Sequence, residues 1–336
     1  MPPVPLPATV MLHRWRSVHE LDAGTRMIGL DPRAALVVGD LLPALADLVV
    51  ELRVPVAPDE FAARAVARGV PAPAAHALLH ALHEAGELVD GGAAGRIEAH
   101  RAAAVVAVHG SGPLTSGIVI GLASSGIGTL HLVTSGEVTG ADLGTGLVGD
   151  DRGRERREAI PAATARAVPG STVTPWPRTV IPDLLVLADE YPDPMQSADL
   201  VTAGIPHLPV RLRDGIGVVG PLVLPGRTAC LGCLDLQRSA CDSHWPRVAA
   251  QLAGRRGGGD PACVQATVGL AVAQAVGAVD ATAGGVPAPP ALEAGLEIDA
   301  GTATITRRPW QAVPGCPCRA ADLPRTHSRG GVTIEG

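Results

Sequence analysis

The first hundred residues alternate between short apolar runs and turn residues, a pattern typical of a small α+β unit. Residues 26–30 and 34–38 are apolar runs separated by Asp31-Pro32-Arg33, an order that predicts a β-hairpin. Three amphipathic helices are expected to follow, over residues 41–52, from an N-cap at Asp59 to Arg68, and over 72–85. With a further strand at 87–90, this order is the winged-helix pattern, which we assign to residues 1–98.

From Ala102 onward the apolar runs become continuous, as expected for strands that are buried on both faces of a parallel sheet. Residues 103–108 form the first run, a Gly-rich turn and a helix over 115–125 follow, and 129–134 is the next strand. This order predicts a βαβ unit. Further strands are expected at residues 183–188, 210–213 and 217–224.

An apolar helix and a hairpin complete the predicted second domain. Residues 264–283 are rich in Ala and Val and are expected to form an almost wholly buried helix, and 296–298 pairs with 302–306. We therefore assign residues 99–322 to a Rossmann-like α/β domain with a mostly parallel sheet. Residues 323–336 are expected to be a loose C-terminal tail.

The composition excludes several classes of function. The sequence contains no Lys and no Asn, so all 27 basic residues are Arg, and any mechanism that requires a Lys or Asn side chain is excluded. Codon bias in a GC-rich genome would explain the absence of Lys and Asn as well as a functional cause would. The net charge of −6 does not favour a nucleic acid or an anionic membrane surface as partner. Without an uninterrupted apolar span or a secretory signal, we expect a cytoplasmic protein with no membrane segment.

Three histidines of the third predicted helix share one face. His76, His80 and His83 are spaced by four and three residues, and they lie opposite Leu78 and Leu82. A metal site or a peptide contact would use this spacing, but a solvated polar face would show the same pattern and is favoured over metal. The helix lacks the basic residues that DNA reading requires.

A Gly-rich turn follows the first strand of the α/β domain. Gly110 would permit the tight turn and Gly112 the close approach of a phosphate to the helix N-terminus. The third motif position is Thr115, and Pro113 removes one N–H group. Thr134 stands where a nucleotide site needs an acid for the ribose. By itself the turn fits a packing role as well as a phosphate site. The hypothesis of NAD-dependent redox chemistry would have this turn as its single supporting feature.

Two cysteine pairs give the most specific signal in the chain. Cys230-x-x-Cys233 and Cys316-x-Cys318 can each direct two thiolates to one ion, and together they complete a tetrahedral all-sulfur site. A closed site of this kind is structural, so we expect a structural Zn²⁺ ion. Four unrelated buried thiols are the alternative.

Two further cysteines have no partner motif. Cys241 and Cys263 are expected to be small core or surface residues, although a nucleophile stays an alternative. Disulfide bonds are not expected in a cytoplasmic chain.

Several motifs together resemble one known family. The cysteine segment from Pro225 to Arg238, the pair Gly24-Thr-Arg and Leu30-Asp-Pro-Arg, and Trp310 before Cys316-Pro-Cys318 resemble the ThiF-like cyclodehydratase partner proteins of bacteriocin and azoline peptide biosynthesis. These TOMM leader peptide-binding proteins are similar to the ThiF/MoeB superfamily of ubiquitin-activating-like enzymes.

The resemblance implies both partners and a site for one of them. In that family the winged-helix unit binds the leader of a precursor peptide as an added strand, and a separate YcaO-type cyclodehydratase closes the rings. The corresponding contacts in this sequence would be Leu36, Val38, His76, His80 and His83. Relatives pair through the α/β domain, so the resemblance also implies a homodimer.

The residues that adenylating relatives use are largely replaced. Aligned by eye, the Asp, Asn, Arg, Lys and Asp of those relatives fall, in that order, at Thr134, Gly144, Thr145, Arg156 and Asp189. Only Asp189 matches in kind, and Arg156 keeps only the charge. Gly110, Gly112 and Asp189 would then form a vestigial nucleotide site at which adenylation by ATP is disfavoured. The resemblance therefore implies a non-catalytic peptide-binding protein, with an active adenylyltransferase of a C-terminal carboxylate as the alternative.

Overall fold

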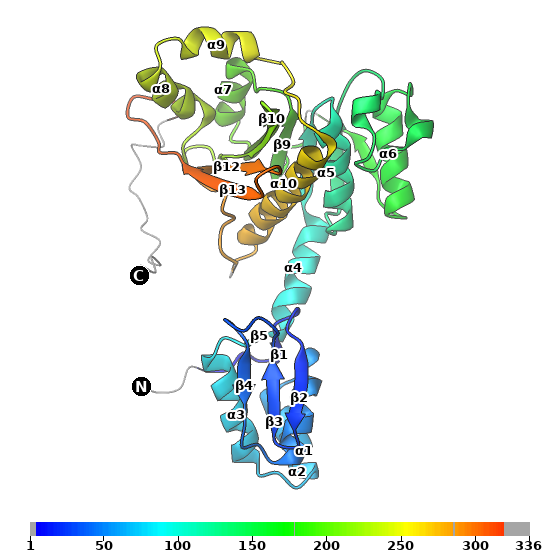
Figure 1. The fold of residues 1–336 in the computed structure, drawn as a ribbon, viewed down its shortest axis with the longest axis vertical. Coiled ribbons are helices and arrows are strands. Elements are labelled where there is room, and N and C mark those ends of the chain that lie inside the picture. Colours follow the sequence, from blue (N-terminus) through cyan, green and yellow to red (C-terminus); the bar gives the residue numbers. More distant parts are fainter. Residues whose placement is uncertain (1–4, 178, 285, 319–336) are drawn as a thin grey trace. The chain divides into compact units, whose positions relative to one another are not determined.

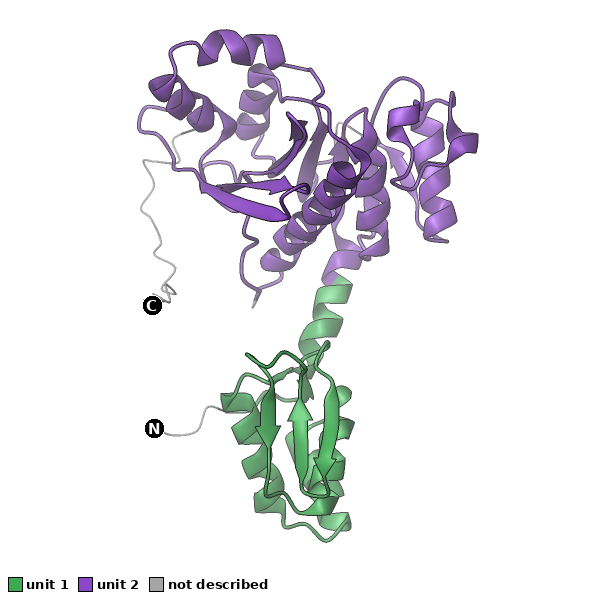
Figure 2. Cartoon of the chain, viewed as in Figure 1, with its two compact units in different colours: residues 1–99 green, residues 100–336 purple. Residues whose placement is uncertain are grey.

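The computed structural model describes residues 5–177, 179–284 and 286–318 of the 336-residue chain. The chain divides into two compact units, Met1–Ala99 and His100–Gly336 (Figure 2). Helix α4 (Gly91–Ala103) contains the last residues of the first unit and the first residues of the second. The predicted tail at 323–336 lies outside the described residues.

The first unit contains two small antiparallel sheets and three helices (Figure 1). Its three-stranded sheet has the order β2-β3-β4, with strands β2 (Val18–Asp22), β3 (Thr25–Ile28) and β4 (Leu36–Val38). A second pair joins β1 (Val10–Leu12) to β5 (Leu88–Asp90). The helices are α1 (Pro43–Leu48), which continues as the 3₁₀ helix η1 (Val49–Arg53), α2 (Pro58–Ala67) and α3 (Ala72–Glu84). The winged-helix assignment stays a prediction.

Proline, not a capping side chain, is the first residue of α1 and α2, and Pro71 is the N-cap of α3. Asp59 was expected to cap α2, but the N-cap is Ala57, and Pro58 is the first helical residue. Proline suits this position because its fixed φ matches the helix and its missing N–H would have no helical partner. The helices then pack around a core whose fully buried side chains include Phe61, Leu79 and Leu82.

The second unit is built on one eight-stranded sheet with the order β13-β12-β11-β10-β9-β6-β7-β8. Its strands are β6 (Val105–His109), β7 (Thr129–Val133), β8 (Val173–Pro175), β9 (Leu184–Asp189), β10 (His207–Arg213), β11 (Ile216–Val219), β12 (Ala294–Asp299) and β13 (Thr304–Pro309). Strands β8, β7, β6, β9 and β10 are parallel, and the remaining three pairs are antiparallel. The expected mostly parallel sheet is confirmed.

Helices cover both faces of this sheet. Helices α5 (Pro113–Ser124) and α10 (Pro261–Thr282) pack on the face that carries Val106, Val186 and Val210. Leu185 and Leu187 alternate to the other face and pack with α7 (Pro194–Thr202). The remaining helices are α6 (Arg156–Ala167), α8 (Leu231–Cys241), α9 (Trp245–Leu252) and the 3₁₀ helices η2 (Gly140–Asp142) and η3 (Gly149–Asp151).

Helix α10 differs from the expectation in its burial. In the part of the chain that the structure describes, it is the one helix that is long and apolar enough to cross a membrane, and only 50% of its most apolar 18-residue window is buried. The expectation of an almost wholly buried helix is therefore wrong. The helix packs on α5 and on the sheet, and the other half of this apolar window is not buried.

Two glycines of α5 allow α10 to approach closely. A Cβ atom at Gly117 would lie 2.8 Å from Val268, and one at Gly121 would lie 2.6 Å from Val272. Gly269, in contrast, is exposed on α10 with no atom within 4 Å of the same point.

We expect Gly117→Val to lower the free energy of unfolding by about 1–3 kcal/mol, because the added side chain overpacks the α5–α10 contact. Gly269→Ala is the matched control, and it should raise the same quantity by about 0.5–1 kcal/mol because Ala favours the helix. Urea unfolding followed by circular dichroism measures both. Equal stability of Gly117→Val and the wild type would contradict this packing.

Candidate functional site

The predicted nucleotide-site residues meet at the switch point of the parallel sheet. Strands β6 and β9 are neighbours, but the chain leaves β6 toward β7 and leaves β9 toward β10, on opposite sides. In sheets of this type, ligands bind outside the carboxyl ends of the strands at that point. Gly110 and Gly112 follow β6, and Asp189 is the last residue of β9.

Asp189 occupies the N-terminus of α5 with its own carboxylate. Oδ2 accepts hydrogen bonds from the N–H of Gly112 (2.9 Å) and of Thr115 (3.2 Å) and from the Thr115 hydroxyl (2.5 Å). Oδ1 accepts one from the N–H of Leu114 (2.9 Å). A helix N-terminus favours an anion through its unpaired N–H groups and its dipole. These donors, which would face a phosphate, are already used.

The backbone is shaped for this contact. Asp189 has φ of 71°, in the left-handed region, and only 3% of the residue is exposed. A Cβ atom at Gly112 would lie 2.6 Å from Asp189 Oδ1, so the close approach expected of Gly112 is made to a carboxylate of the chain. Burial raises the pKa of Asp189, and its four hydrogen bonds oppose this shift because they favour the charged form.

Two serines close the turn on its other side. The N–H of Ser135 donates to Ser111 Oγ (3.1 Å), and the two hydroxyls lie 3.3 Å apart. Ser135 comes directly after Thr134, the position at which the sequence lacks a ribose-binding acid. The guanidinium of Arg256 donates to the carbonyl of Ser111. These three side-chain contacts, which the sequence did not indicate, tie the turn to β7 and to the loop after α9.

Arg156 is not available for a phosphate. It is 4% exposed, and it donates to Asp142 Oδ2 (2.8 Å) and to the carbonyl of Ser135 (2.9 Å). Although burial of Asp142 opposes its ionisation, Arg156 and Thr139 hold the pKa of this carboxyl below its ordinary value. The basic side chain therefore forms a buried structural ion pair.

Gly144 and Thr145 are also structural. Gly144 has φ of 95°, and Thr145 Oγ1 donates to the carbonyl of Pro113 (2.9 Å) and lies 2.9 Å from Ser116 Oγ. Both residues support the loop beside α5. Neither supplies the amide or the basic side chain expected at these positions of an adenylating enzyme.

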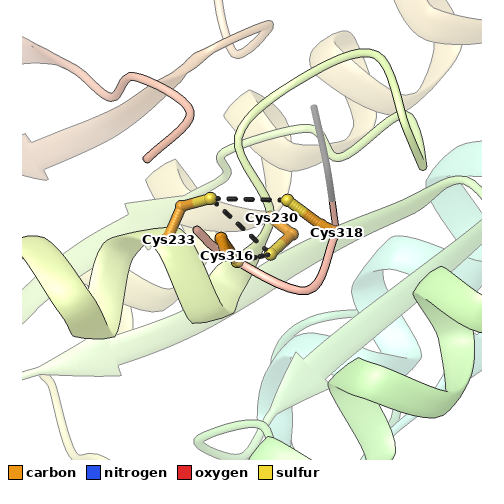
Figure 3. A group of neighbouring side chains, drawn as sticks. All are labelled: Cys230, Cys233, Cys316 and Cys318. Atoms are coloured by element: carbon orange, nitrogen blue, oxygen red, sulfur yellow. Dashed lines mark hydrogen bonds between the residues drawn. The ribbon is translucent and has the colours of Figure 1, made fainter. Parts of the chain in front are cut away.

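The structure brings the two cysteine pairs together (Figure 3). Cys230 is the N-cap of α8, Cys233 lies in the first turn of that helix, and Cys316 and Cys318 follow β13. Sulfur–sulfur distances are 3.9 Å for Cys230–Cys233, 3.6 Å for Cys230–Cys316 and 3.5 Å for Cys233–Cys318. All four sulfurs lie within 4.8 Å of one another and all four residues are buried.

This geometry fits a tetrahedral metal ion such as zinc. A Zn–S bond of about 2.3 Å places tetrahedral sulfurs about 3.8 Å apart, close to the separations observed. Burial raises the pKa of the Cys230 thiol above its ordinary value and that of Cys316 to about 11. The metal-free thiols of Cys230 and Cys316 are therefore neutral at neutral pH, and binding a cation must displace their protons.

The other two cysteines lie outside this group. Cys263 is buried in α10, 1% exposed, with its sulfur 4.0 Å from Thr267 Oγ1. Cys241 is exposed at the end of α8.

The residues expected to contact a peptide lie on β4 and α3. Leu36 and Val38 are half-buried on a strand at the edge of its sheet. His76, His80 and His83 are half-buried too, and the Nδ1 atoms of His80 and His83 are buried without a hydrogen-bond partner. Among the described residues they do not form a metal-binding group, since the cysteine cluster is the one group found.

Comparisons with known proteins identify the fold. Escherichia coli MccB, in a structure with AMPCPP and MccA, superimposes with a TM-score of 0.69 at 16% identity, over 92% of this chain and 98% of MccB. The microcin C7 biosynthetic enzyme MccB in complex with N-formylated MccA gives a TM-score of 0.68 at 15% identity, over 93% and 99%. A heterocyclase in complex with substrate and cofactor gives 0.60 at 12% identity, over 98% of this chain and 42% of its own length.

No known protein-family profile matches the chain, and no curated protein matches it in sequence. At these identities the structural likeness establishes the fold alone. The chain therefore has the ThiF/MoeB-like fold of MccB, which confirms at the level of fold the resemblance found in its motifs.

Proposed function

We propose that this chain binds a precursor (leader) peptide and presents it to a partner YcaO-type cyclodehydratase, without adenylating activity of its own. The observation that carries this proposal is the Asp189 carboxylate at the N-terminus of α5, in a fold that elsewhere is found with ATP analogues.

Loss of phosphate chemistry follows from the contacts around the turn. A nucleotide phosphate would have to displace a buried carboxylate that accepts four hydrogen bonds. Arg156 is held by Asp142, and the sequence contains no Lys to take its place. Phosphoryl and adenylyl transfer depend on prearranged positive groups that stabilise the developing charge. At the turn itself, the guanidinium of Arg256 donates to the carbonyl of Ser111, so this cation is engaged by the backbone.

The proposed peptide site is the open edge of β4. This strand pairs only with β3 in the three-stranded sheet, so its other edge can accept an extended peptide as a further strand. Val37, at its centre, is 56% exposed, whereas Leu36 and Val38 pack toward the core. The histidines of α3 would add side-chain contacts to the bound peptide.

The structural neighbours support peptide binding. MccB is found with MccA, and the heterocyclase is found with its substrate. The proposal extends such binding to this chain, with a homodimer of the α/β unit and a separate YcaO-type enzyme as partners.

The cysteine cluster completes the proposal as a structural zinc site. Its four ligands leave no open position for a substrate, so the ion would stabilise the fold and would not activate a reactant. It would fix the segment after β13 to the start of α8.

An active adenylyltransferase of a C-terminal carboxylate is the second candidate, favoured by the MccB structures with AMPCPP and with ATP. It requires Asp189 to leave α5 so that a nucleotide can enter. ATP–pyrophosphate exchange that Asp189→Ala abolishes would favour this candidate, and absence of exchange would favour the scaffold.

We expect Val37→Glu to weaken binding of a candidate leader peptide at least tenfold, because the charge faces the neighbours of the added strand. Val66→Glu is the matched control, since Val66 is 55% exposed on α2, and its affinity should equal that of the wild type. Isothermal titration calorimetry measures both. No binding of the wild type at tens of micromolar, or equal effects of the two variants, would argue against the β4 site.

We expect Asp189→Gly to lower the free energy of unfolding by about 1–3 kcal/mol, because buried donors lose their acceptor while Gly tolerates the left-handed backbone. Sulfate should then raise the melting temperature of the variant more than that of the wild type, since the free donors can hold the anion. Asp193→Gly, which removes the exposed cap of α7, should show no such extra effect. Identical responses of all three proteins would exclude an anion cradle masked by Asp189.

We expect the purified protein to contain one zinc ion per chain, measured by elemental mass spectrometry. Cys233→Ser should lose the metal and unfold at a lower temperature, because binding a structural zinc contributes on the order of 10 kcal/mol to folding. Cys241→Ser should keep both metal and stability, since Cys241 is exposed outside the cluster. Full zinc content in Cys233→Ser would be incompatible with the four-sulfur site.

A further inference from the structure

A pocket separate from the Asp189 site lies between the sheet face that α7 covers and helices α8 and α9. Its volume is about 210 Å³, and its lining is largely apolar, with Leu234, Trp245 and Leu252 among the residues. This is smaller than the roughly 300–1,000 Å³ of sites that enclose drug-sized ligands, so it suits a group the size of one amino acid. Gly110, Gly112 and Asp189 do not line it.

Arg211 of β10 enters this pocket as a buried cation without an ion pair. Its neighbours Val210 and Leu212 belong to the core on the opposite face, and Arg211 is 6% exposed. Its Nε has no hydrogen-bond partner, and none of the described carboxylates makes an ion pair with it. Its guanidinium carbon lies 5.0 Å from the centre of the Tyr191 ring. A buried guanidinium without a carboxylate is costly, and an anionic ligand would offset that cost.

Arg238 of α8 brings a second cation to the same pocket. Its guanidinium carbon lies 4.5 Å from the Trp245 ring centre and 5.5 Å from that of Trp310. In the described part of the chain it makes no ion pair either. Burial lowers the pKa of Arg238 and that of Arg211, the latter to about 10, so Arg211 stays charged at neutral pH.

Besides the cysteine cluster, one carboxylate lines the pocket among the described residues. Asp235 lines the pocket, but its Oδ1 accepts the indole N–H of Trp245 (3.0 Å). Arg213 faces Glu297, at 2.9 Å, and does not line the pocket. Two guanidiniums and one carboxylate sum to a charge of plus one before the cysteine cluster in the pocket wall is counted.

The metal cluster is also close, because Cys230 and Cys316 lie in the pocket wall. A metal-bound set of thiolates would be negative and could itself attract the arginines. However, no hydrogen bond joins Arg211 or Arg238 to Cys230 or Cys316. The sulfurs of Cys230 and Cys316 contact each other, and that of Cys230 also contacts Cys233. The unpartnered Nε of Arg211 is therefore left for a ligand.

We propose that this pocket binds a small apolar carboxylate, with the carboxylate on Arg211 and Arg238 and the apolar body against Leu234, Trp245 and Leu252. Guanidinium groups recognise carboxylates through paired hydrogen bonds, and the surrounding apolar wall removes water from that contact. Either a free acid or the C-terminal residue of a peptide carries this chemistry. The proposal does not depend on the function proposed above.

The test is isothermal titration of the full-length protein with N-acetyl-leucine, which represents a peptide C-terminus, and with 4-methylpentanoate, a free acid of similar shape. Their neutral amides are the controls. We expect at least one acid to bind, with its amide at least tenfold weaker. Binding of N-acetyl-leucine alone identifies a peptide end as the ligand, and tight binding of 4-methylpentanoate identifies a free acid.

Variants locate the site. Arg211→Gln and Arg238→Gln should each weaken binding at least tenfold, and Arg213→Gln, on the same strand but outside the pocket, should not. If Arg211→Gln does not fold, Arg238→Gln carries the test, since that side chain is partly exposed. Absence of binding by both acids, unchanged affinity in Arg238→Gln, or equal competition by inorganic phosphate would overturn the proposal.

Discussion

The hydrogen bonds from the first turn of α5 to the Asp189 carboxylate are the interaction on which the α/β unit depends. They join the end of β9 to the helix that follows β6, across the switch point of the sheet. One set of N–H donors can serve only one anion. The contact that holds the two elements together therefore removes the place where a nucleotide phosphate would bind.

Elsewhere in this unit, buried arginines with and without an ion pair differ in what they can do. Arg156 is buried but paired with Asp142, so it stabilises the loop around the turn. Arg211 is buried and unpaired, in a pocket that a second free cation, Arg238, also lines. The binding sites that we propose thus lie away from the nucleotide position: at the edge of β4, at the four cysteines, and between α7, α8 and α9.

The sequence predicted those features that depend on local pattern. Apolar runs located four of the five parallel strands but not β8, and spacing alone indicated the four-cysteine group. It did not predict α4, whose three glycines disfavour a helix, or α6, which is polar and contains Pro161. The inward turn of Asp189 depends on a left-handed backbone set by tertiary contacts. Arg211 was visible only as a charge within a buried strand, and its convergence with Arg238 requires the folded sheet.

The central claim is that the α5 donors are held by Asp189 and are closed to ATP. The most direct measurement is a ¹H–¹⁵N NMR titration with MgATP that follows the amides of Gly112, Leu114 and Thr115. Our account predicts that their resonances keep the positions of a hydrogen-bonded, anion-facing amide and do not shift at millimolar nucleotide. Saturable shifts of these three amides would show that ATP displaces Asp189 and would contradict it.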